Sequence, residues 1–369
     1  MRLVSRTLLG SALFTLGLAA CGGAPDEASS GSTPAGGVVL TGVGGSGAGG
    51  TVGAGGAGGE SSTSGGDGGG GGSATKLGPP YPIVLAHGFF GFEKFAGQDF
   101  VTYFYGVKQQ LQGEGEIVFT PAVDPFNTSD FRGAQLAARI EEIVAKTGYE
   151  KVNIIGHSQG GLDARVAANL RPDLVASVVT VATPHGGSPV ADVVLKIVAD
   201  PNAQGVVSDL FNLIGAPLYD EIGEETDVIL PLKLFSSPGI DAFNKAHPDS
   251  PGVFYASIAG RTDLHIGGDP CDADVALPFI SDWEDTLDIT DPMMSLCESI
   301  LDGGFGDPYP NDGLVRVKDS KHGQFWGCLP TDHLDEVGQL FGDGAGLGNK
   351  WNHEAFYSAV VAELRKRGF

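Results

Sequence analysis

A serine between two glycines is the strongest chemical signal in the sequence. Gly-His-Ser-Gln-Gly at 156–160 follows a β-branched run at 151–155 and precedes a helical pattern. In that setting the serine sits on a strained strand-to-helix turn with its Oγ exposed, above a helix N-terminus that favours negative charge. We therefore predict that Ser158 is a nucleophile. The alternative is a glycine turn that contains a structural serine.

A serine nucleophile needs donors for the oxyanion that forms when it attacks. One donor is expected to be the backbone N–H of Gln159, the residue after the nucleophile. The second should come from the turn after the apolar run 81–86, where we select the N–H of Phe89. We expect His87, in the same turn, to order that turn rather than to take part in catalysis.

The serine also needs a base and an acid that orients the base. The base should come late in the chain, where His322, His333 and His353 qualify by position. His333 stands in a polar loop, and Asp312 stands 21 residues earlier in a turn that we expect a short strand to follow. Composition alone does not choose among these histidines.

Strand and helix patterns alternate along the body of the chain. Apolar or β-branched runs predict strands, and apolar residues at helical spacing, such as Leu136, Ile140, Ile143 and Val144, predict helices. The predicted strands are 81–86, 151–155, 176–182 and 253–259, and the predicted helices are 133–147, 160–170 and one near 356–364. This order indicates an α/β fold with a mostly parallel sheet and helices on both faces.

The N-terminus predicts export and a lipid anchor. Arg2 and Arg6 precede an apolar segment from Leu8 to Leu18, which is too short to span a bilayer. It ends in Leu-Ala-Ala-Cys, which resembles the bacterial lipobox and implies a signal peptide at 1–20 and lipidation of Cys21. Gly22, rather than an aspartate, favours the outer membrane or cell surface. The alternative is an ordinary cleaved signal that contains a cysteine.

Residues 21–75 cannot form a core. Of the 59 glycines in the chain, 23 lie between Gly22 and Ser73. We expect a flexible linker with a reach of about 40 Å, or alternatively an adhesive or phase-separating segment. Residues 76–369 are the expected catalytic domain. The net charge of −23 argues against binding to nucleic acid or anionic lipid by charge.

The body of the chain resembles a known family. The run Tyr-Pro-Ile-Val-Leu-Ala-His-Gly-Phe-Phe-Gly at 81–91 is similar to the opening of the Pseudomonas-type bacterial true lipases, a branch of the α/β hydrolases. The resemblance covers about residues 80–345 and continues through Tyr-Phe-Tyr-Gly at 103–106, Lys-Val-Asn-Ile-Ile-Gly-His-Ser-Gln-Gly-Gly at 151–161, Ala-Thr-Pro-His-Gly-Gly-Ser at 182–188, Asn-Asp-Gly-Leu-Val at 311–315 and His-Leu-Asp-Glu-Val at 333–337.

The resemblance implies a role for several of these residues. Ser158 matches the nucleophile, Asp312 the triad acid and His333 the base, and Phe89 and Gln159 match the oxyanion-hole positions. The family also holds one structural calcium ion. Its side-chain ligands match Asp291 and Asp335, and the positions that bind it through backbone carbonyls match Gln339 and Asp343. Carboxylates with carbonyl oxygens suit Ca²⁺.

Two features depart from the family or are left open by it. The family often has one disulfide, and here the pair Cys271–Cys328 brackets the acid in a similar way, with Cys271–Cys297 as the alternative. The apolar stripe at 206–214 lies where the family places its lid, although a core helix would show the same pattern. Many relatives need a dedicated foldase.

The expected activity is that of a triacylglycerol lipase acting on lipid esters at an oil–water interface. The alternatives are a short-chain carboxylesterase or polyester depolymerase with the same triad, and an inactive hydrolase-fold binding module. No P-loop or dinucleotide fingerprint is present, so no nucleotide or redox cofactor is expected.

Overall fold

The computed structural model describes residues 76–88, 103–198, 229–262, 271–281, 297, 300–301, 309–339 and 350–369. All of them belong to the unit Gly71–Phe369. The predictions made for the signal peptide, Cys21, the linker and the stripe at 206–214 lie outside the described residues. Among the described residues, none of the helices combines the length and the apolar character that a transmembrane span requires.

A parallel sheet of six strands forms the centre of the described structure. Its order is β2-β1-β3-β4-β5-β6, and each neighbouring pair is parallel. The strands are β1 (Ile83–Ala86), β2 (Val118–Phe119), β3 (Val152–His157), β4 (Val175–Val181), β5 (Phe254–Gly260) and β6 (Gln324–Leu329). The sequence prediction of a mostly parallel sheet is therefore confirmed.

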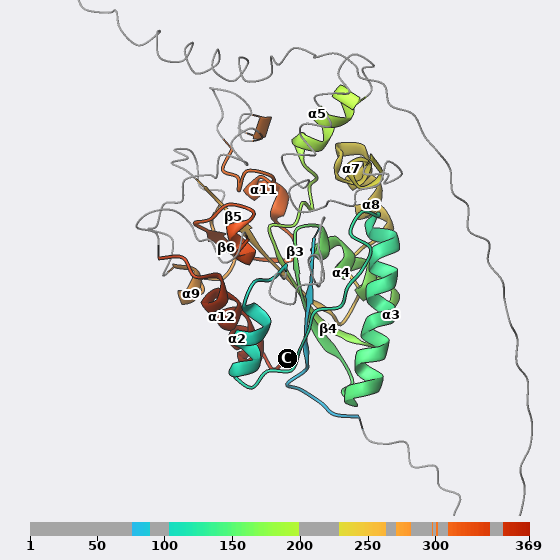
Figure 1. Cartoon of the computed structure of the whole chain (residues 1–369), viewed down its shortest axis with the longest axis vertical. Coiled ribbons are helices and arrows are strands. Elements are labelled where there is room, and N and C mark those ends of the chain that lie inside the picture. The colour runs from blue at the N-terminus through green and yellow to red at the C-terminus, as the bar shows by residue number, and fades with distance from the viewer. Residues whose placement is uncertain are drawn as a thin grey trace, which may run out of the picture. The chain divides into compact units, whose positions relative to one another are not determined.

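Helices cover both faces of this sheet (Figure 1). The helices are α2 (Val107–Gly113), α3 (Ser129–Thr147), α4 (Gln159–Leu170), α5 (Pro189–Val198), α7 (Ile229–Phe235), α8 (Ser237–Ala246), α9 (Pro278–Ser281), α11 (Val317–Ser320), η2 (Asp335–Val337) and α12 (His353–Lys366). The helical stripes predicted in α3 and α12 are buried.

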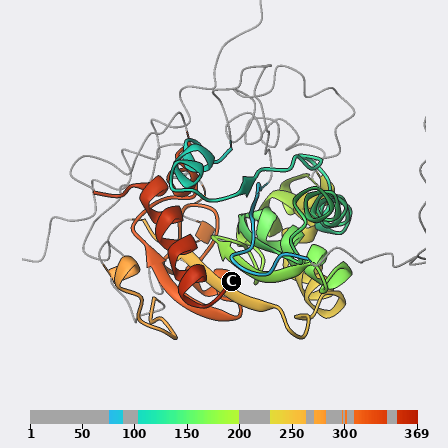
Figure 2. The same cartoon turned by 90° about the horizontal axis from the view of Figure 1, so that it is seen from below.

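The two faces of the sheet bury separate cores because side chains alternate along each strand. Ile83 and Leu85 of β1 pack into the core formed with α2 and α12, whereas Val84 packs into the core formed with α3 and α4. Seen from below, α2 and α12 lie on one side of the sheet, and α3 and α4 lie on the other (Figure 2).

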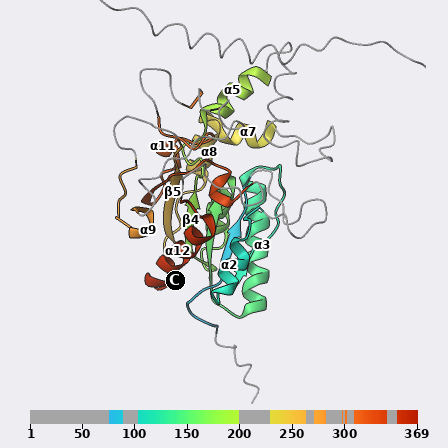
Figure 3. The same cartoon turned by 60° about the vertical axis from the view of Figure 1, so that its left-hand side comes forward.

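All strands end at the same edge, because they run parallel. The segments that leave β1, β3, β5 and β6 therefore meet at this edge, and α5, α7 and α11 lie at the same end of the molecule (Figure 3). This edge receives His87, Ser158 and His333, and it is where parallel α/β sheets place their ligands.

The prediction of a strand after the Asp312 turn is wrong. Asn311 and Arg316 form an isolated antiparallel bridge, and α11 begins directly afterwards at Val317. The amides of Leu314 and Val315 donate to the Asp312 carboxylate, so they are not available to a strand ladder.

A substitution at Gly160 tests the close packing of β1, β3 and α4. A Cβ at this position would overlap the carbonyl group of Ala86, which is main chain and cannot rotate away. We expect Gly160→Ala to lower the free energy of unfolding by about 3 kcal/mol in urea denaturation. Gly113→Ala is the matched control: a Cβ there meets nothing within 4 Å, so stability should be kept or slightly raised. Equal stability of the two variants would contradict this packing argument.

Candidate functional site

Ser158 occupies the strained turn that the sequence predicts. It lies between β3 and α4 with φ 54° and ψ −130°, a conformation that costs free energy for a residue with a Cβ. The Ser158 N–H donates to Val181 O at 2.9 Å, and the Thr183 hydroxyl donates to Ser158 O at 2.8 Å. These bonds from the adjoining strand and loop hold the turn in place.

Glycines bring the neighbouring backbones close to Ser158. A Cβ on Gly156 would lie 2.6 Å from Gly160 O, so the strand and the helix approach each other only because both residues lack a side chain. A Cβ on Gly88 would lie 2.7 Å from the Ser158 Cβ. The turn after β1 therefore lies directly against the serine.

Asp312 and His333 form a hydrogen-bonded pair at the same edge. His333 Nδ1 lies 2.8 Å from Asp312 Oδ2, and both side chains are almost completely buried. The amides of Leu314 and Val315 donate to the other carboxylate oxygen at 2.8 and 2.6 Å. Three donors thus fix the carboxylate, and its bond to Nδ1 leaves the Nε2 atom of His333 available for the serine.

The other two late histidines have different partners. His322 Nε2 pairs with Asp249 Oδ1 at 2.7 Å, and His353 Nε2 donates to Tyr105 O at 2.7 Å. Of the three histidines that qualified by position, only His333 bonds to Asp312 in the described structure.

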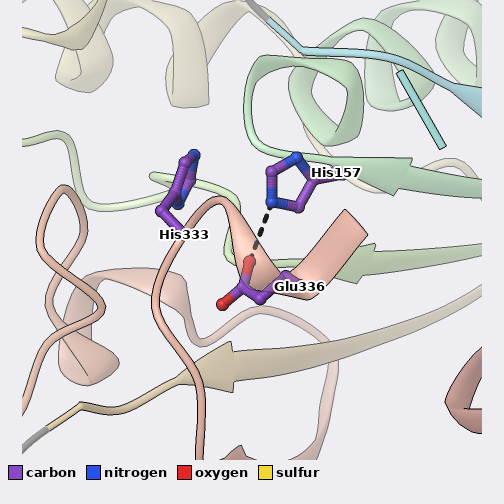
Figure 4. Close-up of side chains that lie close together, drawn as sticks. All are labelled: His157, His333 and Glu336. Carbon is purple, nitrogen blue, oxygen red and sulfur yellow. Dashed lines mark hydrogen bonds and ion pairs between the residues drawn. The ribbon is translucent and has the colours of Figure 1, made fainter. Parts of the chain in front are cut away.

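A second buried carboxyl group lies beside the base. Glu336 Oε2 is 2.8 Å from His157 Nε2, and the Tyr103 hydroxyl is 2.7 Å from His157 Nδ1. The rings of His157 and His333 are 4.6 Å apart between centroids, so His157 links the nucleophile turn to the base loop (Figure 4). One ring nitrogen each of His157 and His333 and one carboxylate oxygen of Glu336, atoms that could ligate a metal ion, lie within 4.8 Å of one another.

Burial makes the His157–Glu336 pair electrically neutral. Burial and the neighbouring His333 lower the pKa of His157 well below its usual value. Burial and the carboxyls of Asp312, Asp332 and Asp335 raise the pKa of Glu336 well above its usual value. The pair therefore shares one proton without adding a net charge beside the base.

Sequence reasoning assigned no role to His157 or Glu336, although both lie in motifs that it quoted. Each is a titratable residue within three positions of a proposed catalytic residue. That proximity was the available signal.

The oxyanion side of the site is partly described. Phe89 lies outside the described residues. Gln159 is the first residue of α4, where backbone N–H groups have no acceptor within the helix. Its side-chain amide donates to Asn127 O at 2.8 Å, which holds the residue in place.

His87 has the structural role that the sequence analysis expected. The Val123 N–H donates to His87 Nε2 at 3.2 Å, so Nδ1 carries the proton and donates to Gly88 O at 3.0 Å. Burial and the Arg132 guanidinium lower the pKa of His87 to about 3. Both ring nitrogens are used to order the turn, which leaves none for proton transfer.

Arg132 holds the same turn in place, a role that was not predicted from the sequence. Its guanidinium is fully buried, donating to His87 O at 2.7 Å, to Gly88 O at 3.1 Å and to Asp124 O at 2.8 Å. Its Nε atom donates to Asp163 Oδ2 at 2.7 Å. Arg132 stands four residues before Leu136 on the buried stripe of α3, and a charge at that spacing was the signal for a buried ion pair.

Two of the four predicted calcium-binding positions are described. Asp335 is buried at the start of η2, and its carbonyl accepts the Trp351 indole N–H at 3.0 Å. Gln339 is buried and donates from its side chain to Tyr103 O at 3.1 Å. Asp291 and Asp343 lie outside the described residues.

The disulfide pairing is the first of the two alternatives that the sequence left open. Cys271 and Cys328 form a disulfide, and Cys297 is free and buried. Burial raises the pKa of the Cys297 thiol to about 11, so it is protonated at neutral pH.

The low pKa of His87 predicts that part of the protein's stability is lost in acid. Its folded-state pKa of about 3 lies below the ordinary value of 6.5, so the unfolded chain binds the proton more tightly. Stability from neutral His87 is present above pH 6.5 and is lost as the pH falls, by about 2 kcal/mol between pH 7 and pH 5. We expect the free energy of unfolding in urea to fall less over this range in His87→Gln than in the parent chain. Parallel pH dependences would contradict this account.

Comparisons with known proteins agree with this geometry. A family model described as alpha/beta hydrolase fold matches residues 81–221. A triacylglycerol lipase of Vibrio cholerae is 35% identical over an alignment of 274 residues, which covers 71% of this chain and 81% of that protein. A triacylglycerol lipase of Pseudarthrobacter phenanthrenivorans is 32% identical over 291 residues, covering 71% of this chain and 90% of that protein.

A solved structure gives the same fold. EstA from Clostridium botulinum matches with a TM-score of 0.50 and 20% identity, covering 79% of this chain and 88% of that one. The chain therefore belongs to the triacylglycerol lipase family of the α/β hydrolases and is an enzyme that hydrolyses carboxylic esters.

Proposed function

We propose that this enzyme is a triacylglycerol lipase that releases fatty acids through an acyl-enzyme on Ser158. The observation that carries the proposal is the placement of Ser158, on its strained turn, at the same sheet edge as the hydrogen-bonded pair of Asp312 and His333. The relatives named triacylglycerol lipase, similar over most of this chain, support the substrate class.

The proposed mechanism follows from the hydrogen bonds of the site. His333 takes the Ser158 proton on Nε2 while Oγ attacks the ester carbonyl, and Asp312 orients the ring and stabilises the imidazolium through Nδ1. The Gln159 amide, together with the Phe89 amide, holds the oxyanion. His333 then protonates the leaving alcohol, and a water molecule that His333 deprotonates releases the fatty acid.

The substrate class is tested with two substrates. We expect the full chain to hydrolyse an emulsion of a long-chain triglyceride and a soluble short-chain ester, both followed by acid release. Ser158→Ala should lower both rates at least about 10⁴-fold, because it removes the nucleophile. Asp312→Asn should retain binding and lower kcat.

Each outcome has a distinct meaning. Activity on the short ester alone would identify a carboxylesterase and overturn the lipase assignment. Activity that persists in Ser158→Ala would overturn the proposed nucleophile.

We propose that a structural calcium ion lies beside the base loop, held by Asp291, Asp335 and the carbonyls of Gln339 and Asp343. The supporting observation is electrostatic. Asp312, Asp332, Asp335 and Glu336 are all buried in one region, and burial together with the three aspartates raises the pKa of Glu336. A divalent cation would offset this repulsion and pin the loop that carries His333. It supplies no step of the reaction.

Calcium binding is tested by thermal unfolding. We expect a chelator to lower Tm by about 5 °C, since a ligand that binds only the folded state stabilises that state. Asp335→Asn should show the lower Tm with or without added calcium. Asp241→Asn, on the exposed side of α8, is the control and should keep the full calcium response. A calcium response that survives in Asp335→Asn would refute the site.

We also propose export and anchoring through lipidated Cys21, with residues 21–75 as a spacer to the outer membrane or cell surface. The support is the short apolar segment that ends in Leu-Ala-Ala-Cys and the glycine-rich composition after it. A dedicated foldase is a proposed partner on the ground of family resemblance.

A further inference from the structure

The hydroxyl group of Tyr103 lies beside the proposed nucleophile. A Cβ built on Gly88 would lie 2.6 Å from Tyr103 Oη and 2.7 Å from the Ser158 Cβ. Both groups therefore border the same point, and the distance between them cannot exceed the sum of these two distances. The carbon that Ser158 Oγ attacks is two bonds from the Ser158 Cβ, so an oxygen on that carbon lies within hydrogen-bond reach of the hydroxyl.

This hydroxyl lies on the oxyanion side of the proposed site. The point that it shares with Ser158 is the position next to the α-carbon of Gly88, in the turn after β1. Gly88 directly precedes Phe89, whose amide is the proposed second oxyanion donor. The turn after β1 therefore brings the tyrosine hydroxyl and the proposed donor to the same side of the serine.

The ring of Tyr103 is held in place before any substrate binds. The side chain is buried, and its ring packs against the rings of His87, Phe104 and His157 at centroid distances of 5.9, 5.3 and 5.6 Å. Its carbonyl accepts the side-chain amide of Gln339 at 3.1 Å. A polar group fixed in this way needs no reorganisation when charge develops beside it, which is the property of an effective oxyanion donor.

The bond to His157 sets the direction in which the hydroxyl donates. Tyr103 Oη lies 2.7 Å from His157 Nδ1, and His157 Nε2 lies 2.8 Å from Glu336 Oε2 (Figure 4). In the neutral pair, the Glu336 O–H donates to Nε2, and His157 Nδ1–H donates to the Tyr103 oxygen. A hydroxyl that accepts one hydrogen bond still donates its own proton, so the Tyr103 O–H is directed to an acceptor other than His157.

We propose that Tyr103 is a further catalytic residue, whose hydroxyl donates a third hydrogen bond to the oxyanion beside the Gln159 and Phe89 amides. This inference rests on the proposed acyl-enzyme mechanism at Ser158. The bond is stronger to the charged oxyanion than to the neutral ester carbonyl, so it lowers the activation free energy without tightening substrate binding. The motif at 103–106 thereby gains a role in the reaction.

The test removes the hydroxyl alone. In the full chain, with a soluble short-chain ester, we expect Tyr103→Phe to lower kcat about 10²-fold and to leave KM unchanged, as loss of one oxyanion donor does. Tyr357→Phe is the matched control. Tyr357 is buried in the same core as Tyr103, and its hydroxyl has no hydrogen-bond partner in the described structure, so both kinetic constants should be unchanged. Near-UV circular dichroism checks that each variant is folded.

Two further measurements separate contact with the oxyanion from an effect that acts through His157. Phenylboronic acid forms a tetrahedral adduct with a serine nucleophile and mimics the intermediate, so its inhibition constant should rise at least about tenfold in Tyr103→Phe. The pKa of the base, read from the pH profile of kcat/KM, should stay unchanged. A structural role through His157 would instead displace the loop of His333 and shift that pKa.

The contrary outcomes are distinct. An unchanged kcat in Tyr103→Phe, or a lower kcat with a shifted pKa and an unchanged inhibition constant, would overturn the role of Tyr103 alone. Full activity in Ser158→Ala would overturn the proposed nucleophile and this role with it. If Tyr103→Phe does not fold, 3-fluorotyrosine in place of Tyr103 supplies the answer: its fluorine resonance should shift when the boronic acid binds, and an unchanged resonance would refute the contact.

Discussion

The close approach of three main-chain segments around Ser158 is the constraint on which the rest of the site depends. Helix α4 starts one residue after the serine and packs against the end of β1, which is possible only because Gly156 and Gly160 have no Cβ. Ser158 must then adopt a left-handed φ of 54°. The same geometry places the Gln159 amide at the N-terminus of α4, so one arrangement positions both the proposed nucleophile and a proposed oxyanion donor.

Two buried polar networks flank this turn, and each supports a different side of the proposed site. Arg132 and Asp163 fix the turn after β1, which precedes the proposed oxyanion donor Phe89. His157 and Glu336 connect the nucleophile turn to the loop of the base. Removing one partner from either network would leave a buried polar or charged group without compensation, which is usually more destabilising than the pair is stabilising. Burial raises the pKa of Asp163 to about 6 even beside Arg132, which shows how strongly this interior opposes charge.

Periodicity was enough to predict strands β1, β3, β4 and β5 and helices α3, α4 and α12, but not strands β2 and β6. The pairing of Asp312 with His333 came from the family resemblance. Neither source was enough where a contact joins distant elements. Arg132 could be recognised as a charge on a buried stripe, but its partner lies 31 residues away on another helix, and no local pattern names it. The expected strand after Asp312 failed because the acid itself captures the backbone amides that a strand would use. Spacing likewise cannot choose a disulfide when three cysteines are available.

The loop that carries the base depends on cross-links because β6 is the last strand of the described sheet. On the inner side, its exit is tied to β5 by the bond from Arg261 N–H to Leu329 O, and His333 N–H donates to Asp312 O at 2.9 Å. On the outer side, no strand is present among the described residues, and the disulfide to Cys271 holds the segment that covers β6. Within the described residues, the loop of the base is therefore held by these bonds and the disulfide rather than by a further strand beyond β6.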